Sequence, residues 1–163
     1  MLKWQLKQSM LHSLKKLVYL QERQRRLLIE AGIAIGFAVF QLRRAPFKQI
    51  VADWGNSQAV SLDSHTDTLS PQAKEIGWAI NAINRRLPWQ GTCLVQAMAA
   101  RRMLRRQSIS NTIYFGVRSN SKSDKSTTLD AHAWLSVGDC ILVGKSGHKQ
   151  FSVLSIFVDS YET

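Results

Sequence analysis

The sequence predicts an α+β protein in which helices come first and an antiparallel sheet follows. Up to about residue 106, apolar side chains recur at the three- and four-residue spacing of amphipathic helices. From residue 111 onward the pattern changes to short runs rich in β-branched and aromatic residues, separated by polar or glycine-containing turns. Helices followed by strands are typical of the α+β class rather than of alternating α/β proteins.

Residues 1–54 are predicted to form an N-terminal helical subdomain. The most apolar run, residues 27–40, contains Glu30 and is shorter than the roughly 20 residues that cross a bilayer, so it is predicted to be a core helix. A peripheral membrane contact remains the alternative, because arginines flank this run. Pro46 ends the pattern, and residues 47–54 are expected to form a further short helix. In the first segment, the residues at helical spacing are Leu6, Met10, Leu14, Leu17 and Leu20.

A polar joint, residues 55–69, separates this subdomain from the predicted core domain, residues 70–163. The joint is rich in Ser, Asp, Asn and Thr, as loops are. Ser70 is placed to cap a helix that starts at Pro71, and Thr92 is placed to cap a second helix that runs to about residue 106. The predicted strands are residues 111–118, 131–137, 140–143 and 151–158.

Charge and composition narrow the possible partners. The net charge of +11 suggests an acidic partner: nucleic acid, an anionic membrane or an acidic peptide. A solvated basic surface without a single partner is equally compatible with it. The basic residues are spread along the chain and no nucleic-acid motif is present, which argues against nucleic acid. Two cysteines do not make a disulfide framework, so a cytoplasmic location is expected. No metal-ligand spacing or phosphate loop is present, so no metal or cofactor is expected.

The first segment with chemical potential is Pro-Trp-Gln-Gly-Thr-Cys-Leu, residues 88–94. If Thr92 is the cap, Cys93 is the first helical residue, where free backbone N–H groups and the helix dipole favour a thiolate. The Cys93 N–H, with the side chain of Trp89 or Gln90, could bind the oxyanion of an acyl-transfer intermediate. By itself the segment is better explained by a buried structural cysteine that happens to start a helix.

The second segment is Leu-Asp-Ala-His-Ala-Trp-Leu, residues 129–135. His132 lies near the start of a strand between two alanines, whose small side chains leave the imidazole accessible to a group that docks against it. A core histidine with satisfied hydrogen bonds is the alternative.

A two-residue turn at residues 138–139 would fix how the strands on either side of it pair. It pairs Val137 with Cys140 and His132 with Lys145. Cys140 then lies on the face opposite His132, which leaves only the other cysteine as its partner and gives Cys140 a packing role. The face of His132 is predicted to carry Trp134, Ile141 and Val143, and the opposite face Leu135, Val137, Cys140 and Leu142.

A cysteine at a helix start, a strand, and then His-Ala-Trp on the next strand resemble the papain/transglutaminase core. The strings LLIEAGIAIGFAVFQLRRAPF, RRLPWQGTCLVQAMAARRMLRRQSIS, FGVR, LDAHAWLSVGDCILVG and FSVLSIF resemble the stand-alone leader peptidases of lasso-peptide biosynthesis, over residues 26 to 157. These are transglutaminase-like cysteine proteases. The resemblance implies that Cys93 is the nucleophile, that His132 is the general base, and that the substrate is the leader of a ribosomally made precursor. It also implies two partners: a small leader-binding protein and an ATP-dependent macrolactam cyclase.

The third member of the triad does not follow from the resemblance. Gly144 stands on the strand where transglutaminase-type members often have an acid, and Asp139 at the hairpin tip is too far from His132 along the strand. Asp130 is ranked first because it shares strand parity with His132, with a backbone carbonyl or a water as the close alternative. Two other functions remain open: acyl transfer by the same pair, and a non-catalytic basic binding module.

Overall fold

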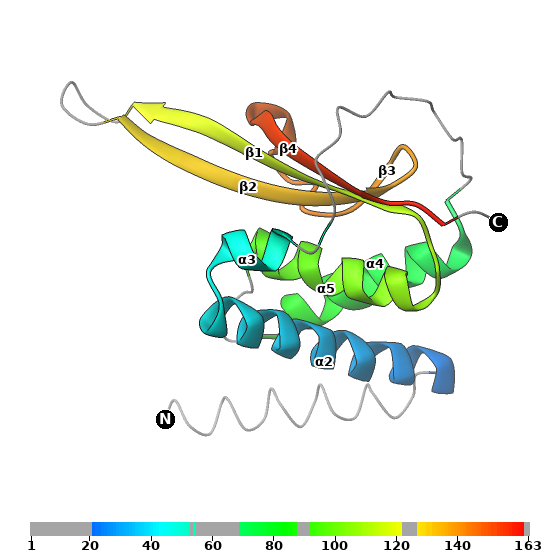
Figure 1. Cartoon of the computed structure of the whole chain (residues 1–163). Helices are drawn as coiled ribbons and strands as arrows, with labels where there is room; N and C mark the ends of the chain where they lie inside the picture. Colours follow the sequence, from blue (N-terminus) through cyan, green and yellow to red (C-terminus); the bar gives the residue numbers. More distant parts are fainter. Residues whose placement is uncertain (1–20, 53, 55–68, 88–91, 122–126, 162–163) are drawn as a thin grey trace, which may run out of the picture.

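The computed structural model describes residues 21–52, 54, 69–87, 92–121 and 127–161. Within them a layer of helices lies against one face of a four-stranded antiparallel sheet, which confirms the predicted α+β class (Figure 1). The helices are α2 (Glu22–Arg44), α3 (Phe47–Ala52), α4 (Pro71–Asn84) and α5 (Cys93–Arg106). The strands are β1 (Asn111–Ser121), β2 (Thr127–Val137), β3 (Cys140–Val143) and β4 (Ser152–Asp159), with the 3₁₀ helix η1 (His148–Gln150) before β4.

The starts of α4 and α5 follow from their capping residues. The Ser70 hydroxyl accepts a hydrogen bond from the Ala73 N–H at 3.2 Å, and Pro71 occupies the first helical position. The Thr92 hydroxyl accepts from the Val95 N–H at 3.4 Å. Each cap satisfies one of the backbone donors that a helix start leaves unpaired. Both predicted helix starts are confirmed.

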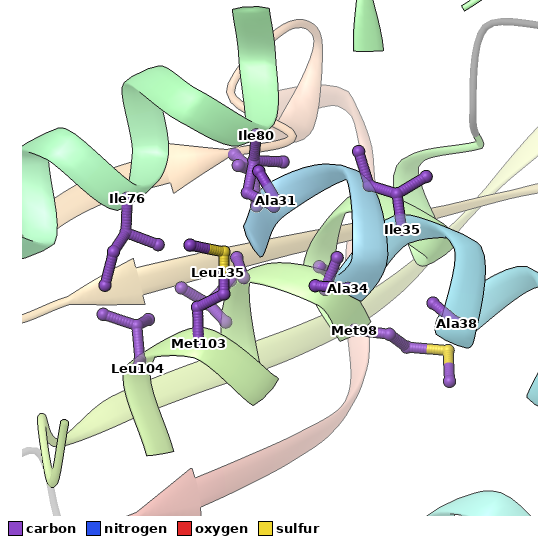
Figure 2. Packing of buried hydrophobic residues seen from close by; sticks show 14 of the residues in the cluster. Ala31, Ala34, Ile35, Ala38, Ile76, Ile80, Met98, Met103, Leu104 and Leu135 are labelled. Atoms are coloured by element: carbon purple, nitrogen blue, oxygen red, sulfur yellow. The ribbon is translucent and has the colours of Figure 1, made fainter. Parts of the chain in front are cut away.

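Helices α2, α4 and α5 share one hydrophobic core with the sheet (Figure 2). Small residues on α2 let its backbone approach α5 closely, and fully buried side chains of α4, α5 and β2 fill the space between the layers. Full burial of one Leu, Ile or Met side chain contributes about 1.5–3 kcal/mol to the free energy of folding. The core includes Ala31, Ala34 and Ala38 of α2, Ile76 and Ile80 of α4, Met103 and Leu104 of α5, and Leu135 of β2. The predicted helix before residue 21 and nearly all of the joint lie outside the described residues.

The strand order is β3-β2-β1-β4, and β1 and β2 are longer than the sequence indicated. Val137 pairs with Cys140, which confirms the two-residue turn. The prediction that His132 pairs with Lys145 is wrong, because β3 ends at Val143 and a bulge shifts the register.

The bulge places Leu142 as an extra residue between the pairs Ser136–Ile141 and Leu135–Val143. Val143 therefore shares the core face with Leu135, rather than the His132 face as predicted. Helix α4 supplies the physical reason for the bulge. The Asn81 side-chain amide donates to the Leu142 carbonyl at 3.1 Å, and a Cβ at Gly77 would lie only 3.3 Å from the Leu142 Cβ. A bulge is the usual way to turn a side chain toward such a contact.

The two faces of β2 have different environments. Ala133, Leu135 and Val137 belong to the core shared with the helices. Since side chains alternate along a strand, His132 and Trp134 project from the opposite face. Trp134 is nevertheless only 5% exposed, because residues after β3 fold back and place His148 against its ring. None of the described helices combines the length and hydropathy needed to cross a bilayer.

Candidate active site

Cys93 is the first residue of α5 and carries a free thiol. Its side chain is half-buried and packs against the core that joins the helices to the sheet. The Cys93 N–H belongs to the first turn, whose donors have no intrahelical partner and give the helix end a partial positive charge. This is a suitable position for a thiolate or for an oxyanion. The predicted oxyanion residues Trp89 and Gln90 lie outside the described residues, so their role stays a prediction.

His132 is held by a backbone carbonyl and two aromatic rings. Its Nε2 lies 2.8 Å from the carbonyl oxygen of Gly144. The imidazole stacks between Trp134, with ring centroids 5.8 Å apart, and Phe151, with centroids 5.0 Å apart. Because a carbonyl oxygen can only accept, Nε2 must carry the hydrogen, and the Nδ1 of the neutral ring then carries the lone pair. Nδ1 is therefore the nitrogen able to accept a proton.

Gly144 is required at its position for two independent reasons. Its φ of +74° lies in the left-handed region, which costs a residue with a side chain about 1–2 kcal/mol. A Cβ there would also lie 2.4 Å from the Ala133 carbonyl oxygen and 2.8 Å from the Trp134 Cα. Position 144 thus admits only glycine in this backbone, and its carbonyl contacts the histidine.

Asp130 forms an ion pair with Arg118 across the β1–β2 ladder, with the Arg118 Nη2 2.9 Å from the Asp130 Oδ2. Arg118 also donates to the Gln150 side chain and lies over the Phe151 ring, 4.9 Å from its centroid. Asp130 therefore contacts the same ring cluster as His132 through Arg118, while the Nε2 hydrogen bond of the imidazole goes to a backbone carbonyl. The orienting role of Asp130 stays a prediction. For the alternative, in which a backbone carbonyl orients the imidazole, the Gly144 carbonyl is the candidate.

The sequence analysis did not identify the aromatic support beneath this histidine. Trp134 stacks on Tyr114 with the ring centroids 5.5 Å apart and the planes 6° apart, and His148 packs on its other side. Gly116 makes room for the indole, because a Cβ there would lie 3.0 Å from the Trp134 ring and 2.9 Å from the Phe151 Cβ. The available sequence signal was Tyr114 and Gly116, which are two residues apart on β1 and so share one face. It predicts room for the indole only when the pairing of β1 with β2 is known.

The structure joins His132 to Gly144, Trp134 and Phe151. The structure does not bring Cys93 and His132 together among the described residues: Cys93 packs on the helix side of the sheet, whereas His132 projects from the opposite face, and no hydrogen bond joins their side chains. Their pairing is taken up below as a proposal. Cys140 pairs with Val137 at the hairpin, on the predicted face, but its side chain is exposed. The packing role predicted for Cys140 is therefore wrong, because its side chain is exposed at the hairpin instead of buried in the core.

Metal-binding side chains do not gather in the described part of the chain, where no group of three or more His, Cys, Asp or Glu residues could hold an ion. What the site offers is one thiol at a helix start and one oriented imidazole. These are the groups of acyl-transfer chemistry through a covalent thioester.

Comparison with known proteins agrees with this chemistry. The family model described as the transglutaminase-like superfamily matches residues 28–156, which include most of α2, all of α3 to α5, the first three strands and most of β4. A search of curated proteins and a search of solved structures each gave no match. The superfamily model covers most of the chain and includes both Cys93 and His132, and the chain therefore belongs to the transglutaminase-like superfamily.

Proposed function

We propose that this protein is a cysteine peptidase that removes the leader peptide from a ribosomally synthesised, lasso-type precursor. The observation that carries the proposal is the His132–Gly144 hydrogen bond, because it leaves Nδ1 able to accept a proton in a chain that also carries a free thiol at a helix start. Membership of the transglutaminase-like superfamily supports a thioester mechanism. The resemblance of residues 26 to 157 to lasso leader peptidases supports the substrate.

The proposed reaction proceeds in two stages. The thiol proton of Cys93 moves to the His132 Nδ1, and the sulfur attacks the scissile carbonyl carbon. The Cys93 N–H, with Trp89 or Gln90, stabilises the oxyanion that forms. When the intermediate collapses, the C–N bond breaks and Nδ1 returns its proton to the leaving amine. Water activated by the same nitrogen then hydrolyses the thioester, which releases the leader carboxylate and the free thiol.

We assign the orienting role to the Gly144 carbonyl, with Asp130 as the competing candidate. The carbonyl oxygen accepts a hydrogen bond from the Nε2–H group, which fixes the tautomer and stabilises the imidazolium. A carboxylate has the same role in Ser-His-Asp triads. Its dipole is weaker than a full negative charge. The assignment therefore implies that the orientation of the imidazole also depends on the Trp134 and Phe151 rings.

A separate protein is proposed to present the leader. The positive charge of the chain suits an acidic leader or an acidic partner. Cleavage by the enzyme alone should then be slow and should weaken as salt screens the attraction. The ATP-dependent cyclase would use the new N-terminus that cleavage exposes.

The decisive experiment incubates the protein with the precursor encoded beside its gene, with and without the small leader-binding protein, and follows the products by mass spectrometry. The expected result is release of the intact leader by the wild type and by Cys140→Ala, and no release by Cys93→Ala. Cleavage that survives in Cys93→Ala but disappears in Cys140→Ala would reject the mechanism. Adding an amine nucleophile tests acyl transfer, since a transferase would give an amide of the leader instead of the free acid.

A further inference from the structure

A groove whose lining does not include Cys93 combines apolar and cationic side chains. It has a volume of about 420 Å³ and lies between α2 and α5, with Trp54 from the end of the α3 segment. Its lining residues are Phe37, Gln41, Trp54, Met98, Arg101, Arg102, Arg105 and Arg106. We refer to these residues as the arginine groove. The proposed peptidase mechanism uses none of them.

Two of the four arginines are already neutralised. The Arg101 Nη2 lies 2.7 Å from the Asp159 Oδ1, and the Arg106 Nη1 lies 3.2 Å from the Glu30 Oε1. Arg105 reaches Asp159 only at 4.0 Å and its side chain is 49% exposed. Arg102 is exposed and forms no ion pair with any carboxylate in the described part of the chain. The arginine groove therefore offers two guanidinium groups, from Arg102 and Arg105, to an external anion.

The aromatic rings of the groove are covered by cations. The Arg101 guanidinium lies 4.4 Å from the centroid of the Trp54 ring, and the Arg102 guanidinium lies 4.0 Å from the centroid of the Phe37 ring. Stacking with nucleic-acid bases needs free ring faces. The rings here instead form an apolar wall with Met98. This combination suits a peptide that carries carboxylates beside an apolar side chain better than it suits a nucleotide.

The position of the groove on α5 separates it from the catalytic thiol. At about 100° per residue, the α5 residues of the groove lie roughly 80–220° around the helix axis from Cys93. A peptide bound there does not continue in a straight line to the thiol. The occupant is therefore better explained as a segment of a second protein than as the stretch of substrate being cut.

We propose that the arginine groove is a docking site for an acidic segment of a partner protein, with Asp or Glu side chains on Arg102 and Arg105 and an apolar side chain against Phe37 and Met98. That the partner is the leader-presenting protein rests on the proposed function. The binding of an acidic, apolar peptide does not, and it can be measured without any peptidase activity.

The test uses fluorescence anisotropy with the full chain and a short fluorescein-labelled peptide of alternating glutamate and leucine. The variant Arg102→Gln/Arg105→Gln should weaken binding at least about tenfold, since a hydrogen bond to a charged group is typically worth that factor. The matched control Arg25→Gln/Arg85→Gln removes the same charge from exposed positions outside the groove and should bind like the wild type. Equal losses in both variants would overturn the proposal, because they would show only non-specific attraction.

Further probes define the chemistry of the occupant. Peptides with glutamine for glutamate, or serine for leucine, should each bind at least about tenfold more weakly. Phe37→Ser should reproduce the serine-peptide loss while leaving the charge unchanged. Thermal melts followed by circular dichroism establish that each variant is folded. A single-stranded oligonucleotide that binds more tightly than the peptide, and loses affinity in Arg102→Gln/Arg105→Gln, would assign the groove to nucleic acid and overturn the proposal.

A crosslinking experiment identifies the source of the segment. Benzoylphenylalanine at position 41, on the groove wall, is irradiated in a mixture of the enzyme, the precursor and the leader-binding protein. Crosslinks to the leader-binding protein are expected. Crosslinks to the precursor leader alone would overturn the assignment to a partner protein. Because crosslinking and anisotropy do not depend on cleavage, an inactive enzyme would reject the proposed function without rejecting the groove.

Discussion

The Nε2 of His132 lies 2.8 Å from the carbonyl oxygen of Gly144. This contact orients the imidazole without a carboxylate and leaves Nδ1 free. It depends on a backbone turn with positive φ that folds directly against Ala133 and Trp134. The contact therefore links the architecture of the β3 end to the proposed chemistry.

Replacing Gly144 by alanine should reduce both stability and activity. The added Cβ would displace the carbonyl from His132, because it would lie 2.4 Å from the Ala133 oxygen. We expect kcat for leader removal to fall about a hundredfold, as when a base loses the group that fixes its tautomer. The matched control is Gly147→Ala, which has the same φ of +74° but open space at its Cβ. It should lose only about 1–2 kcal/mol from backbone strain and keep its turnover. Equal kcat values for the two variants would reject the role of the Gly144 carbonyl.

Asp130→Asn decides between the two orienting candidates. The Arg118–Asp130 pair is more than one-third exposed, so its loss should lower the free energy of unfolding by less than about 1 kcal/mol. If Gly144 orients His132, turnover should stay near the wild-type value. A hundredfold loss of kcat at unchanged stability would instead identify the Asp130 carboxylate as the orienting group. Steady-state kinetics and urea denaturation of the same preparation provide both readouts.

Cys93 should react faster than Cys140 although Cys140 is the more exposed thiol. In the proposed mechanism His132 takes the thiol proton of Cys93, whereas Cys140 lies at the hairpin without such a partner in the proposal. Brief treatment with iodoacetamide at pH 6, followed by peptide mass spectrometry, should label mainly Cys93. His132→Ala should slow this labelling without affecting Cys140. Preferential labelling of Cys140 in the wild type would mean that exposure alone controls reactivity.

Arg101→Ala should be the most destabilising of the arginine substitutions on α5. Arg101 is 5% exposed, and burial lowers the pKa of its guanidinium below the usual value while the contact with Asp159 opposes that shift. Removing it leaves the buried Asp159 carboxylate with only Arg105, at 4.0 Å, and uncovers the Trp54 ring. We expect a loss of about 3–5 kcal/mol in the free energy of unfolding. The neighbouring Arg102→Ala, at an exposed position, should lose less than about 1 kcal/mol. Urea denaturation compares the two, and equal losses would contradict a structural role for the buried pair.

Local sequence signals predicted much of the fold because each depends on neighbouring residues. Ser70 and Thr92 fix the starts of α4 and α5 through bonds that span three residues. The turn between β2 and β3 likewise needs only the residues 138–139 and the pairing of Val137 with Cys140. The register beyond that turn was mispredicted, since the bulge at Leu142 depends on Asn81, which is distant in sequence.

The sequence by itself determined the α+β class, the helix that begins at Cys93 and the strand that carries His132, because periodicity and caps act over a few residues. The tertiary structure alone decided what contacts the imidazole. The partners of His132 are residues that sheet pairing and the segment after β3 bring close to it. No local sequence pattern predicts that Gly144 and Phe151 contact this histidine. The arginine groove has the same origin, because its apolar wall and its cations come from helices that meet only when the core is packed.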